Sequence, residues 1–328
     1  MFKYKKILVT GGTGSFGKKF INKILNEKNI IKIIIFSRDE FKQSNMNLEF
    51  SSHKNFKKLR FFLGDIRDKD RLRIALKDVD CVVHAAALKQ VPAAEYNPME
   101  FIKTNVLGAQ NLVETCLESG VKNIIALSTD KASSPINLYG ATKLCSDKLM
   151  LTANNIKGKQ NIKFSVVRYG NVLGSRGSVL PLFLKCEKYF PITHRDMTRF
   201  NITLDQSINM VLWVLNNNIG GEIFVPKIPS LKIVDLAKAI DNKKKIKIIG
   251  VREGEKIHEE LVSIHEGMNT IEFKNYYAIL NNFSKKRILK YKSSNTNFKR
   301  VKSNFSYNSL ENNVFLNINQ IKKLLKNY

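Results

Sequence analysis

The 328-residue chain has few cysteines, prolines and glycines, with 4, 7 and 17 of these residues. Such low counts exclude a collagen-like chain and a disulfide-stapled scaffold. Long apolar runs are also missing: Ile33–Phe36 is strand-length, whereas a membrane span needs about 20 apolar residues. We therefore expect no membrane segment. Met1–Lys6 leads directly into a predicted strand, so we expect no signal peptide either.

The cysteines are widely separated and lack the spacing of metal ligands. We expect reduced thiols in a cytoplasmic protein, and no metal site. The four residues are Cys81, Cys116, Cys145 and Cys186.

Acidic residues are scarce, with 28 Asp and Glu against 55 Lys and Arg, so the formal charge is +27. Lysine is abundant in every segment together with Asn and Ile, which is typical of a compositional preference across the chain. Only 243–247 and 281–304 are densely basic. No helix-turn-helix, zinc-finger or RNA-binding signature accompanies them, so we expect a solvated surface and no nucleic-acid partner. The stretch 281–304 has no assigned role.

A hydrophobic fraction of 43% can build a core, which excludes a disordered chain. β-branched runs alternate with amphipathic stretches in the first half, which predicts a parallel sheet wrapped by helices. The expected strands are Lys6–Thr10, Lys32–Phe36, Leu59–Leu63, Cys81–Ala85, Asn123–Leu127 and Lys163–Tyr169. Helices are expected at Phe16–Glu27, Lys69–Leu76, Pro98–Ser119 and Tyr139–Asn155.

The predicted fold class is α/β, a Rossmann-type doubly wound parallel sheet with a smaller C-terminal substrate-binding lobe. Residues 1–171 form the expected dinucleotide domain. Residues 172–328 form mainly the lobe, with some segments returning to the first domain.

A glycine-rich run, Thr10–Gly17, follows the first strand and opens a helix. Gly11 allows a tight turn, Gly14 lets the backbone approach a pyrophosphate, and Gly17 lets the helix pack on the sheet. The G-x-x-G-x-x-G spacing is typical of short-chain dehydrogenases. The run predicts a dinucleotide site.

The second strand ends at Ser37-Arg38-Asp39-Glu40, where the adenosine ribose is expected. A hydroxyl and a guanidinium suit a 2′-phosphate, which favours NADP. Asp39 leaves NAD open, since a carboxylate at this place can bind the ribose hydroxyl. Asp65, after the third strand, is expected near the adenine.

Tyr139 and Lys143 form a Tyr-x-x-x-Lys pair, which shares one helix face. Catalysis by Tyr139 as a base at neutral pH needs its pKa to fall about 3 units from its usual value near 10. Lys143 and a positive nicotinamide ring are expected to supply that shift.

Asp130 and Lys131 directly follow the fifth strand, next to this pair. An acid and a base beside an oxidation site indicate an elimination. Oxidation of a sugar C4 hydroxyl acidifies the C5–H, which a neutral Lys131 can remove while a protonated Asp130 protonates the leaving C6 hydroxyl. Burial is expected to favour both uncharged forms.

These motifs together resemble the inverting UDP-N-acetylglucosamine 4,6-dehydratases of the extended short-chain dehydrogenase family, which open pseudaminic acid biosynthesis. The resemblance covers about residues 5–275, and weakly 305–313. Its residues lie in Thr10–Gly17, Ser37–Glu40, His84–Lys89, Glu95–Pro98, Leu127–Lys131, Asn137–Lys143, Arg168–Val179, Met197–Phe200, Gly220–Pro229 and Gly250–Glu259.

The resemblance implies that Tyr139 takes the C4 hydroxyl proton, helped by Lys143 and Thr129, while Asp130 and Lys131 carry the elimination. The implied cofactor is NADP and the implied substrate is UDP-N-acetylglucosamine. The implied cofactor site comprises Gly11, Thr13, Gly14, Ser15, Phe16, Gly17, Ser37, Arg38, Asp39, Glu40, Asp65, Ile66, Ala85, Ala86, Lys89, Asn105, Tyr139 and Lys143. The implied substrate site comprises Lys89, Thr129, Asn171, Ser175, Arg176, Gly177, Ser178, Val179, Thr193, Arg199, Arg252 and Asn313.

Two departures affect the substrate lobe: Asn201 stands where relatives usually have Trp, and Tyr307–Asn313 keeps only part of the family's ending. An NAD-dependent nucleotide-sugar 4-epimerase and a non-catalytic NADP-sensing protein of the same fold remain alternatives. An epimerase needs no acid–base pair at Asp130 and Lys131. Association into dimers or hexamers is an expectation from the family alone.

Overall fold

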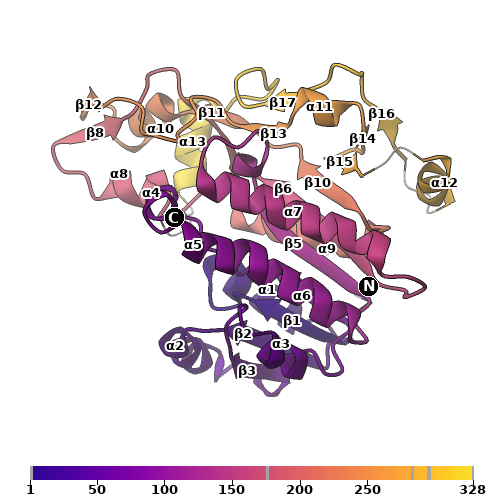
Figure 1. The fold of residues 1–328 in the computed structure, drawn as a ribbon. Helices are drawn as coiled ribbons and strands as arrows, with labels where there is room; N and C mark the ends of the chain where they lie inside the picture. The colour runs from indigo at the N-terminus through magenta and orange to yellow at the C-terminus, as the bar shows by residue number, and fades with distance from the viewer. Residues whose placement is uncertain (1–2, 175–176, 282–283, 294–296, 327–328) are drawn as a thin grey trace.

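The computed structural model describes residues 3–174, 177–281, 284–293 and 297–326. Its central feature is a ten-stranded sheet in the order β16-β14-β15-β10-β6-β5-β4-β1-β2-β3, with helices on both faces (Figure 1). All neighbours from β10 to β3 pair in parallel. The predicted α/β doubly wound class is confirmed.

The six strands predicted in the first half are confirmed, with small shifts at their ends. Most of their side chains are buried, because helices cover both faces of a parallel sheet; the edge strand β3 is the exception, with Arg60 and Leu63 exposed. Leu8, for example, lies in register with Ile34 and Val82, and all three are buried. The strands are β1 (Lys6–Thr10), β2 (Lys32–Ser37), β3 (Leu59–Leu63), β4 (Cys81–His84), β5 (Asn123–Thr129) and β6 (Lys163–Tyr169).

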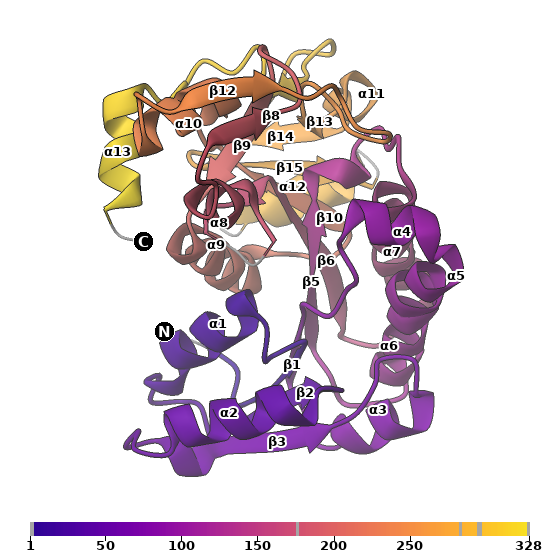
Figure 2. The same ribbon diagram turned by 90° about the vertical axis from the view of Figure 1, so that its left-hand side faces the viewer.

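Helices α1 and α9 pack together on one face of the sheet, while α3, α6 and α7 pack on the other (Figure 2). Helix α2 follows β2. The bounds of these helices are α1 (Ser15–Leu25), α2 (Glu40–Phe50), α3 (Lys69–Ala75), α6 (Gly108–Leu117), α7 (Leu138–Ile156) and α9 (Leu204–Asn217). A short helical turn, η1 (Phe56–Lys58), leads into β3, and α4 (Val91–Tyr96) follows β4.

The continuous helix predicted at Pro98–Ser119 is interrupted. It consists of α5 (Pro98–Phe101), a π-helical segment η2 (Ile102–Leu107) and α6. The wider turn carries the buried Asn105, whose amide contacts the loop after β4. Periodicity alone does not reveal such a local change in hydrogen bonding.

The chain after residue 171 contributes to two regions, and the division at 171 stays a prediction. It extends the large sheet through β10 (Glu222–Pro226), β14 (Thr270–Glu272), β15 (Tyr276–Leu280) and β16 (Lys299–Arg300). It also builds a smaller lobe with its own core, which includes Phe183, Phe190 and Leu236.

The smaller lobe contains two small sheets. One joins β7 (Asn171–Val172), β9 (Thr198–Ile202) and β11 (Ser230–Lys232); the other joins β8 (Tyr189–Ile192) and β12 (Lys245–Ile248). Its helices are α8 (Val179–Leu184), α10 (Ile233–Ile240) and α13 (Ile318–Leu325). Strand β13 (Glu260–Val262), which pairs with β17 (Tyr307–Asn308), and helix α11 (Ile264–Gly267) complete the C-terminal part.

The basic stretch has a structural role over part of its length. Helix α12 (Lys285–Ser293) docks at the start of β10, where the Arg287 guanidinium donates to the carbonyls of Gly220 and Gly221. The buried Tyr291 hydroxyl donates to Glu222. Residues 282–283 and 294–296 of this stretch lie outside the described residues. Across the described ranges, no helix is both long and apolar enough to cross a membrane.

Candidate active site

A cleft of about 1130 Å³ opens at the carboxyl ends of the parallel strands, between the large sheet and the smaller lobe. Ligands of doubly wound folds bind at this edge, because the loops after the strands converge there. Both the glycine-rich loop after β1 and the Tyr139–Lys143 pair of α7 line it. The predicted cofactor and catalytic motifs therefore lie in one cavity.

Most of the predicted site residues line this cleft. Four do not: Glu40, Asn105, Asp130 and Asn313. Ser175 and Arg176 lie outside the described residues. The predicted residues that line the cleft are Gly11, Thr13, Gly14, Ser15, Phe16, Gly17, Ser37, Arg38, Asp39, Asp65, Ile66, Ala85, Ala86, Lys89, Thr129, Lys131, Tyr139, Lys143, Asn171, Gly177, Ser178, Val179, Thr193, Arg199 and Arg252.

The glycine-rich loop fits a dinucleotide. Gly11 has φ +65°, and a Cβ there would lie 2.8 Å from the Ala86 nitrogen. A Cβ on Gly17 would lie 2.5 Å from the Gly12 oxygen, so the helix can approach the loop only without it. Helix α1 also has no side-chain cap at Gly14. Its first N–H groups therefore face the cleft as an anion site.

Ser37, Arg38 and Asp39, at and just after the end of β2, each contact a different partner. The Asp39 carboxylate accepts from the Lys42 amide at 2.9 Å and caps α2. Arg38 is half-exposed at the cleft, 3.5 Å from Asp65, and Ser37 bonds the Thr13 hydroxyl at 2.9 Å. All three side chains thus have a partner in the protein, and all three line the cleft.

Asn105 acts from behind the cleft wall. Its amide oxygen accepts from the Leu88 N–H, and its amide nitrogen donates to the Leu88 carbonyl, both at 2.9 Å. It also donates to the Thr142 hydroxyl at 3.1 Å. Asn105 therefore joins the loop before Lys89 to the catalytic helix, which is a structural role that its predicted place in the cofactor site did not anticipate.

Tyr139 and Lys143 are both buried, at 8% and 3% exposure. Burial raises the pKa of Tyr139 to about 12, although the Lys131 charge and a hydrogen bond with Thr129 oppose the rise. Burial also lowers the pKa of Lys143, while Asp147 opposes that fall. Loss of water around the phenol therefore outweighs the nearby Lys131 charge. The expected lowering, which includes the charge of a nicotinamide ring, stays a prediction.

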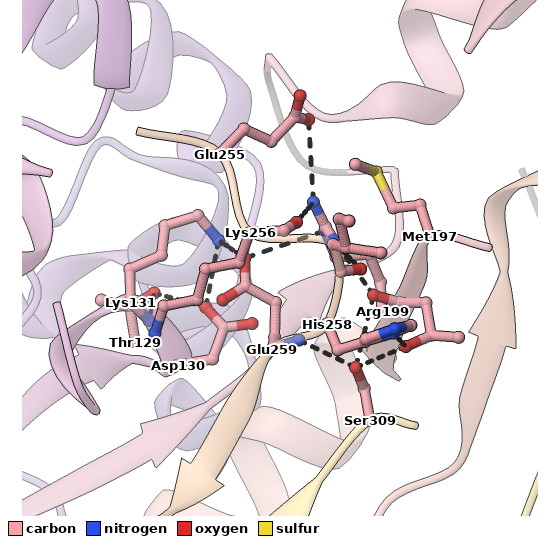
Figure 3. Close-up of polar contacts among 12 residues, drawn as sticks. Thr129, Asp130, Lys131, Met197, Arg199, Glu255, Lys256, His258, Glu259 and Ser309 are labelled. Carbon is pink, nitrogen blue, oxygen red and sulfur yellow. Dashed lines mark hydrogen bonds and ion pairs between the residues drawn. The ribbon is translucent and has the colours of Figure 1, made fainter. Parts of the chain in front are cut away.

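Asp130 and Lys131 form the centre of a buried charge cluster (Figure 3). They lie on the short helix η3 (Asp130–Ala132), immediately after β5. Lys131 Nζ donates to Asp130 Oδ1 at 3.1 Å and to Glu259 Oε1 at 3.0 Å. Thr129 also donates to Asp130 Oδ1, at 2.9 Å. The ammonium is thus held between two carboxylates.

The protonation of this cluster differs in part from the expectation. Burial raises the pKa of Asp130 from its ordinary value, which is the expected direction, while the Lys131 charge opposes the rise. Burial alone would lower the pKa of Lys131, but Asp130 and Glu259 together raise it above its ordinary value. The expectation of a neutral Lys131 is therefore wrong, because two carboxylates face its ammonium.

Arg199 was expected to hold the substrate diphosphate, and the structure directs its donors elsewhere. Nη1 donates to the carbonyls of Thr198 and Ile257, and Nη2 donates to that of Lys256. Its guanidinium also lies 3.8 Å from Glu259 Oε1. Arg199 lines the cleft, but it fixes the loop before β13.

Glu259 was missed as a site residue, although it ends the Gly250–Glu259 segment that carried part of the resemblance. It is 2% exposed, and its partner Lys131 lies 128 residues away. A run rich in Glu and Lys looks like solvated surface in the sequence. No group of three or more His, Cys, Asp or Glu suited to a metal ion occurs in the described part of the chain.

Comparison with known proteins identifies the family of this chain. Residues 7–281 match the family described as "Polysaccharide biosynthesis protein". A relative from Campylobacter jejuni strain 81-176, named UDP-N-acetylglucosamine 4,6-dehydratase (inverting), is 56% identical over 283 residues, or 85% of this chain and 84% of the relative. A relative of the same name from strain NCTC 11168 is 50% identical over 332 residues, or 99% and 98%.

Two further similarities bear on the reaction and the fold. A Rickettsia bellii relative named UDP-glucose 4-epimerase is 42% identical over 337 residues, covering 100% of this chain and 97% of the relative. The solved structure of Pen from Bacillus thuringiensis has a TM-score of 0.88 and 34% identity, covering 100% of this chain and 99% of that one.

Proposed function

The chain belongs to the polysaccharide biosynthesis protein family, and from this premise we propose that it is a UDP-N-acetylglucosamine 4,6-dehydratase (inverting). This activity is that of a carbon–oxygen lyase. One observation carries the proposal: Lys131 and Tyr139 line the cleft that holds the glycine-rich loop, and the buried Asp130, which does not itself line the cleft, is hydrogen-bonded to Lys131.

The proposed cofactor is NADP. A nicotinamide dinucleotide bound in this cleft would supply the oxidation at C4 and the later reduction at C6. The loop from Gly11 to Gly17 would hold its pyrophosphate. Arg38 and Ser37 would bind the 2′-phosphate, because both residues line the cleft and a guanidinium and a hydroxyl suit a phosphate.

Tyr139 would take the proton of the C4 hydroxyl. Burial raises its pKa, so this role needs positive charge near the phenol, and Lys143, one helical turn along α7, is a cation on the same helix face. Thr129, which also lines the cleft, would hold the hydroxyl in place.

Asp130 and Lys131 would carry the elimination. Lys131 would take the C5 proton, and Asp130 would give its proton to the C6 hydroxyl, which leaves as water. Reprotonation of C5 from the opposite face and reduction at C6 give a 4-keto-6-deoxy-L-arabino sugar. One water is lost and there is no net oxidation. The buried Asp130, with its raised pKa, suits the acid role.

The UDP part of the substrate would lie against the smaller lobe. Arg252 is an exposed cation at the cleft, and a guanidinium matches a diphosphate geometrically. The other residues proposed to contact the substrate are Lys89, Thr129, Asn171, Ser175, Arg176, Gly177, Ser178, Val179 and Thr193.

The proposal extends to the setting of the enzyme. We place the reaction at the start of pseudaminic acid or related surface-sugar synthesis, in the cytoplasm, by a homo-oligomer. The names of the Campylobacter relatives support the first part.

A 4-epimerase is the second candidate, favoured by the Rickettsia relative. That reaction transfers no proton at C5 or C6, so it has no use for a buried acid beside a lysine. Here Asp130 is 1% exposed and hydrogen-bonded to Lys131. Burial of this pair costs free energy, which supports the dehydratase.

The deciding experiment incubates the purified protein with UDP-N-acetylglucosamine and either NADP or NAD. We expect a product lighter by one water with inverted C5, read by mass spectrometry and NMR, and faster turnover with NADP. A C4 epimer of unchanged mass would contradict the proposed dehydratase activity. Lys131→Ala should abolish water loss with NADP still bound, whereas Lys122→Ala, at an exposed lysine before β5, should retain it.

A further inference from the structure

Lys131 is held by a carboxylate from a distant part of the chain. Glu259 precedes β13, and its Oε1 lies 3.0 Å from Lys131 Nζ, opposite the 3.1 Å contact with Asp130 (Figure 3). The Glu259 side chain is 2% exposed, and it lines the cleft. It reaches the acid–base pair from the other wall of the cavity.

We propose that Glu259 is a positioning residue for the reaction: its carboxylate aims the Lys131 amine and sets the protonation state in which Lys131 meets the substrate. This inference rests on the proposed function for its catalytic consequence. The effect of Glu259 on the position and protonation of Lys131 can be tested without substrate.

The backbone of Glu259 is anchored for this role. Its N–H donates to the Ser309 hydroxyl at 2.9 Å, and its carbonyl accepts from the Ser309 N–H at 2.7 Å. The Ser309 hydroxyl in turn bonds the Thr198 hydroxyl at 2.7 Å. Because a fixed backbone limits where the carboxylate can reach, the contact with Lys131 is built into the packing of three segments.

The charges around Lys131 explain why a second carboxylate is needed. Asp130 and Glu259 attract the ammonium, whereas Arg199 from β9 and Lys256 from the same loop as Glu259 repel it. Tyr139 from α7 faces it as a neutral phenol. Burial raises the pKa of Asp130, whereas Lys131 and Arg199 hold the pKa of Glu259 below its ordinary value, so Glu259 keeps its negative charge to lower pH than Asp130 does. Without it, the two cations would dominate.

The carboxylates of Asp130 and Glu259 each have one oxygen that makes no hydrogen bond in the described part of the chain. Within the described residues, Asp130 Oδ2 and Glu259 Oε2 are buried and have no hydrogen-bond partner. A buried oxygen without a partner is costly, and it can accept a proton.

The test compares Glu259→Gln with Glu260→Gln. Glutamine keeps the size and one acceptor oxygen but removes the charge. Glu260 is the adjacent carboxylate, and it accepts from the Ser133 and Ser134 hydroxyls without touching Lys131. An amine-reactive reagent labels neutral lysines only, and mass spectrometry gives the rate for each lysine at each pH.

We expect Lys131 in Glu259→Gln to be labelled at least about tenfold faster at pH 8 than in the wild type, because each unit of pKa lost raises the neutral fraction about tenfold. Glu260→Gln should leave that rate unchanged. Equal Lys131 rates in the wild type and Glu259→Gln, or the same acceleration in Glu260→Gln, would overturn the proposal.

The catalytic consequence has its own readout. The alkaline-rising limb of the kcat profile should move to lower pH in Glu259→Gln, with KM within about threefold of wild type; a uniform loss at every pH would indicate a merely structural role. If the wild type dehydrates nothing yet labelling shifts, the proposed function fails and the role of Glu259 in setting Lys131 stands.

If Glu259→Gln fails to fold, the labelling rates of two lysines can be compared in the wild-type protein instead. Burial lowers the pKa of Lys256, whereas the two carboxylates hold that of Lys131 high. Lys256 should therefore be labelled faster than Lys131 in the wild-type protein. Equal or faster labelling of Lys131 would contradict the proposal without any variant.

Discussion

At the scale of single residues, Gly140 connects the two pairs that we propose to be catalytic, Tyr139–Lys143 and Asp130–Lys131. It follows Tyr139 on α7, and a Cβ there would lie 2.2 Å from the Lys131 carbonyl oxygen. The close approach of α7 to η3 therefore requires a residue without a side chain. This contact holds the Tyr139 phenol and the Asp130–Lys131 pair at a fixed separation.

Gly140→Ala should move these pairs apart. We expect dehydration to fall at least about tenfold, since small misplacements of catalytic groups are costly, and stability to fall by about 1–3 kcal/mol. Urea unfolding and product assays measure both effects. Gly120→Ala is the matched control, because nothing lies within 4 Å of a Cβ there. A Gly140→Ala enzyme with full activity would contradict the assigned contact.

At the scale of elements, Arg168 ties β6 to α7 and α11. Its side chain is fully buried, with Nη1 donating to Glu266 at 2.9 Å and Nη2 lying 3.5 Å from Asp147. Asp147 also accepts from Ser128 at 2.7 Å and faces Lys143 one turn earlier on α7. The catalytic helix is thus fixed to the sheet and to the C-terminal part by one guanidinium.

Arg168→Met should leave two carboxylates without their buried cation. Loss of one partner of such a network costs about 3–5 kcal/mol, and we expect that decrease in the free energy of unfolding, measured in urea. Arg60→Met is the control, because Arg60 is exposed on β3 and donates only to nearby carbonyls. Equal stability of the two variants would show that the network contributes nothing.

At the scale of the whole molecule, the charge of +27 is spread over the fold. The cleft uses a few cations, such as Arg38, Lys131 and Arg252, and Arg287 is used to dock α12. The remaining lysines repel one another across the surface. Self-repulsion of this kind destabilises a compact chain and is screened by salt.

Added salt should therefore stabilise this protein. We expect the free energy of unfolding, measured in urea, to rise on the order of 1 kcal/mol between low and moderate NaCl concentrations. Sulfate at equal ionic strength separates screening from binding: equal gains indicate screening, and a gain with sulfate alone indicates an anion held in the cleft. No change with either salt would contradict the self-repulsion.

The sequence by itself determined the first half of the fold and the places of its motifs. Strands such as β1 and β5 are short β-branched runs, buried on both faces, and their pattern is local. The glycine spacing and the Tyr139–Lys143 pair depend on one loop and one helix. Features that reside within a few neighbouring residues can be read without knowledge of the rest of the chain.

Only the tertiary structure decided what faces Lys131. A separation of 128 positions between Lys131 and Glu259 leaves no local pattern, and the raised pKa of Lys131 follows from Asp130 together with this distant contact. The sequence predicted that some C-terminal segments return to the first domain, but only the tertiary structure identified β10 and β15 among them. It also showed that backbone carbonyls use the Arg199 donors. Burial and long-range pairing arise from packing of the whole chain, so the protonation of the site does as well.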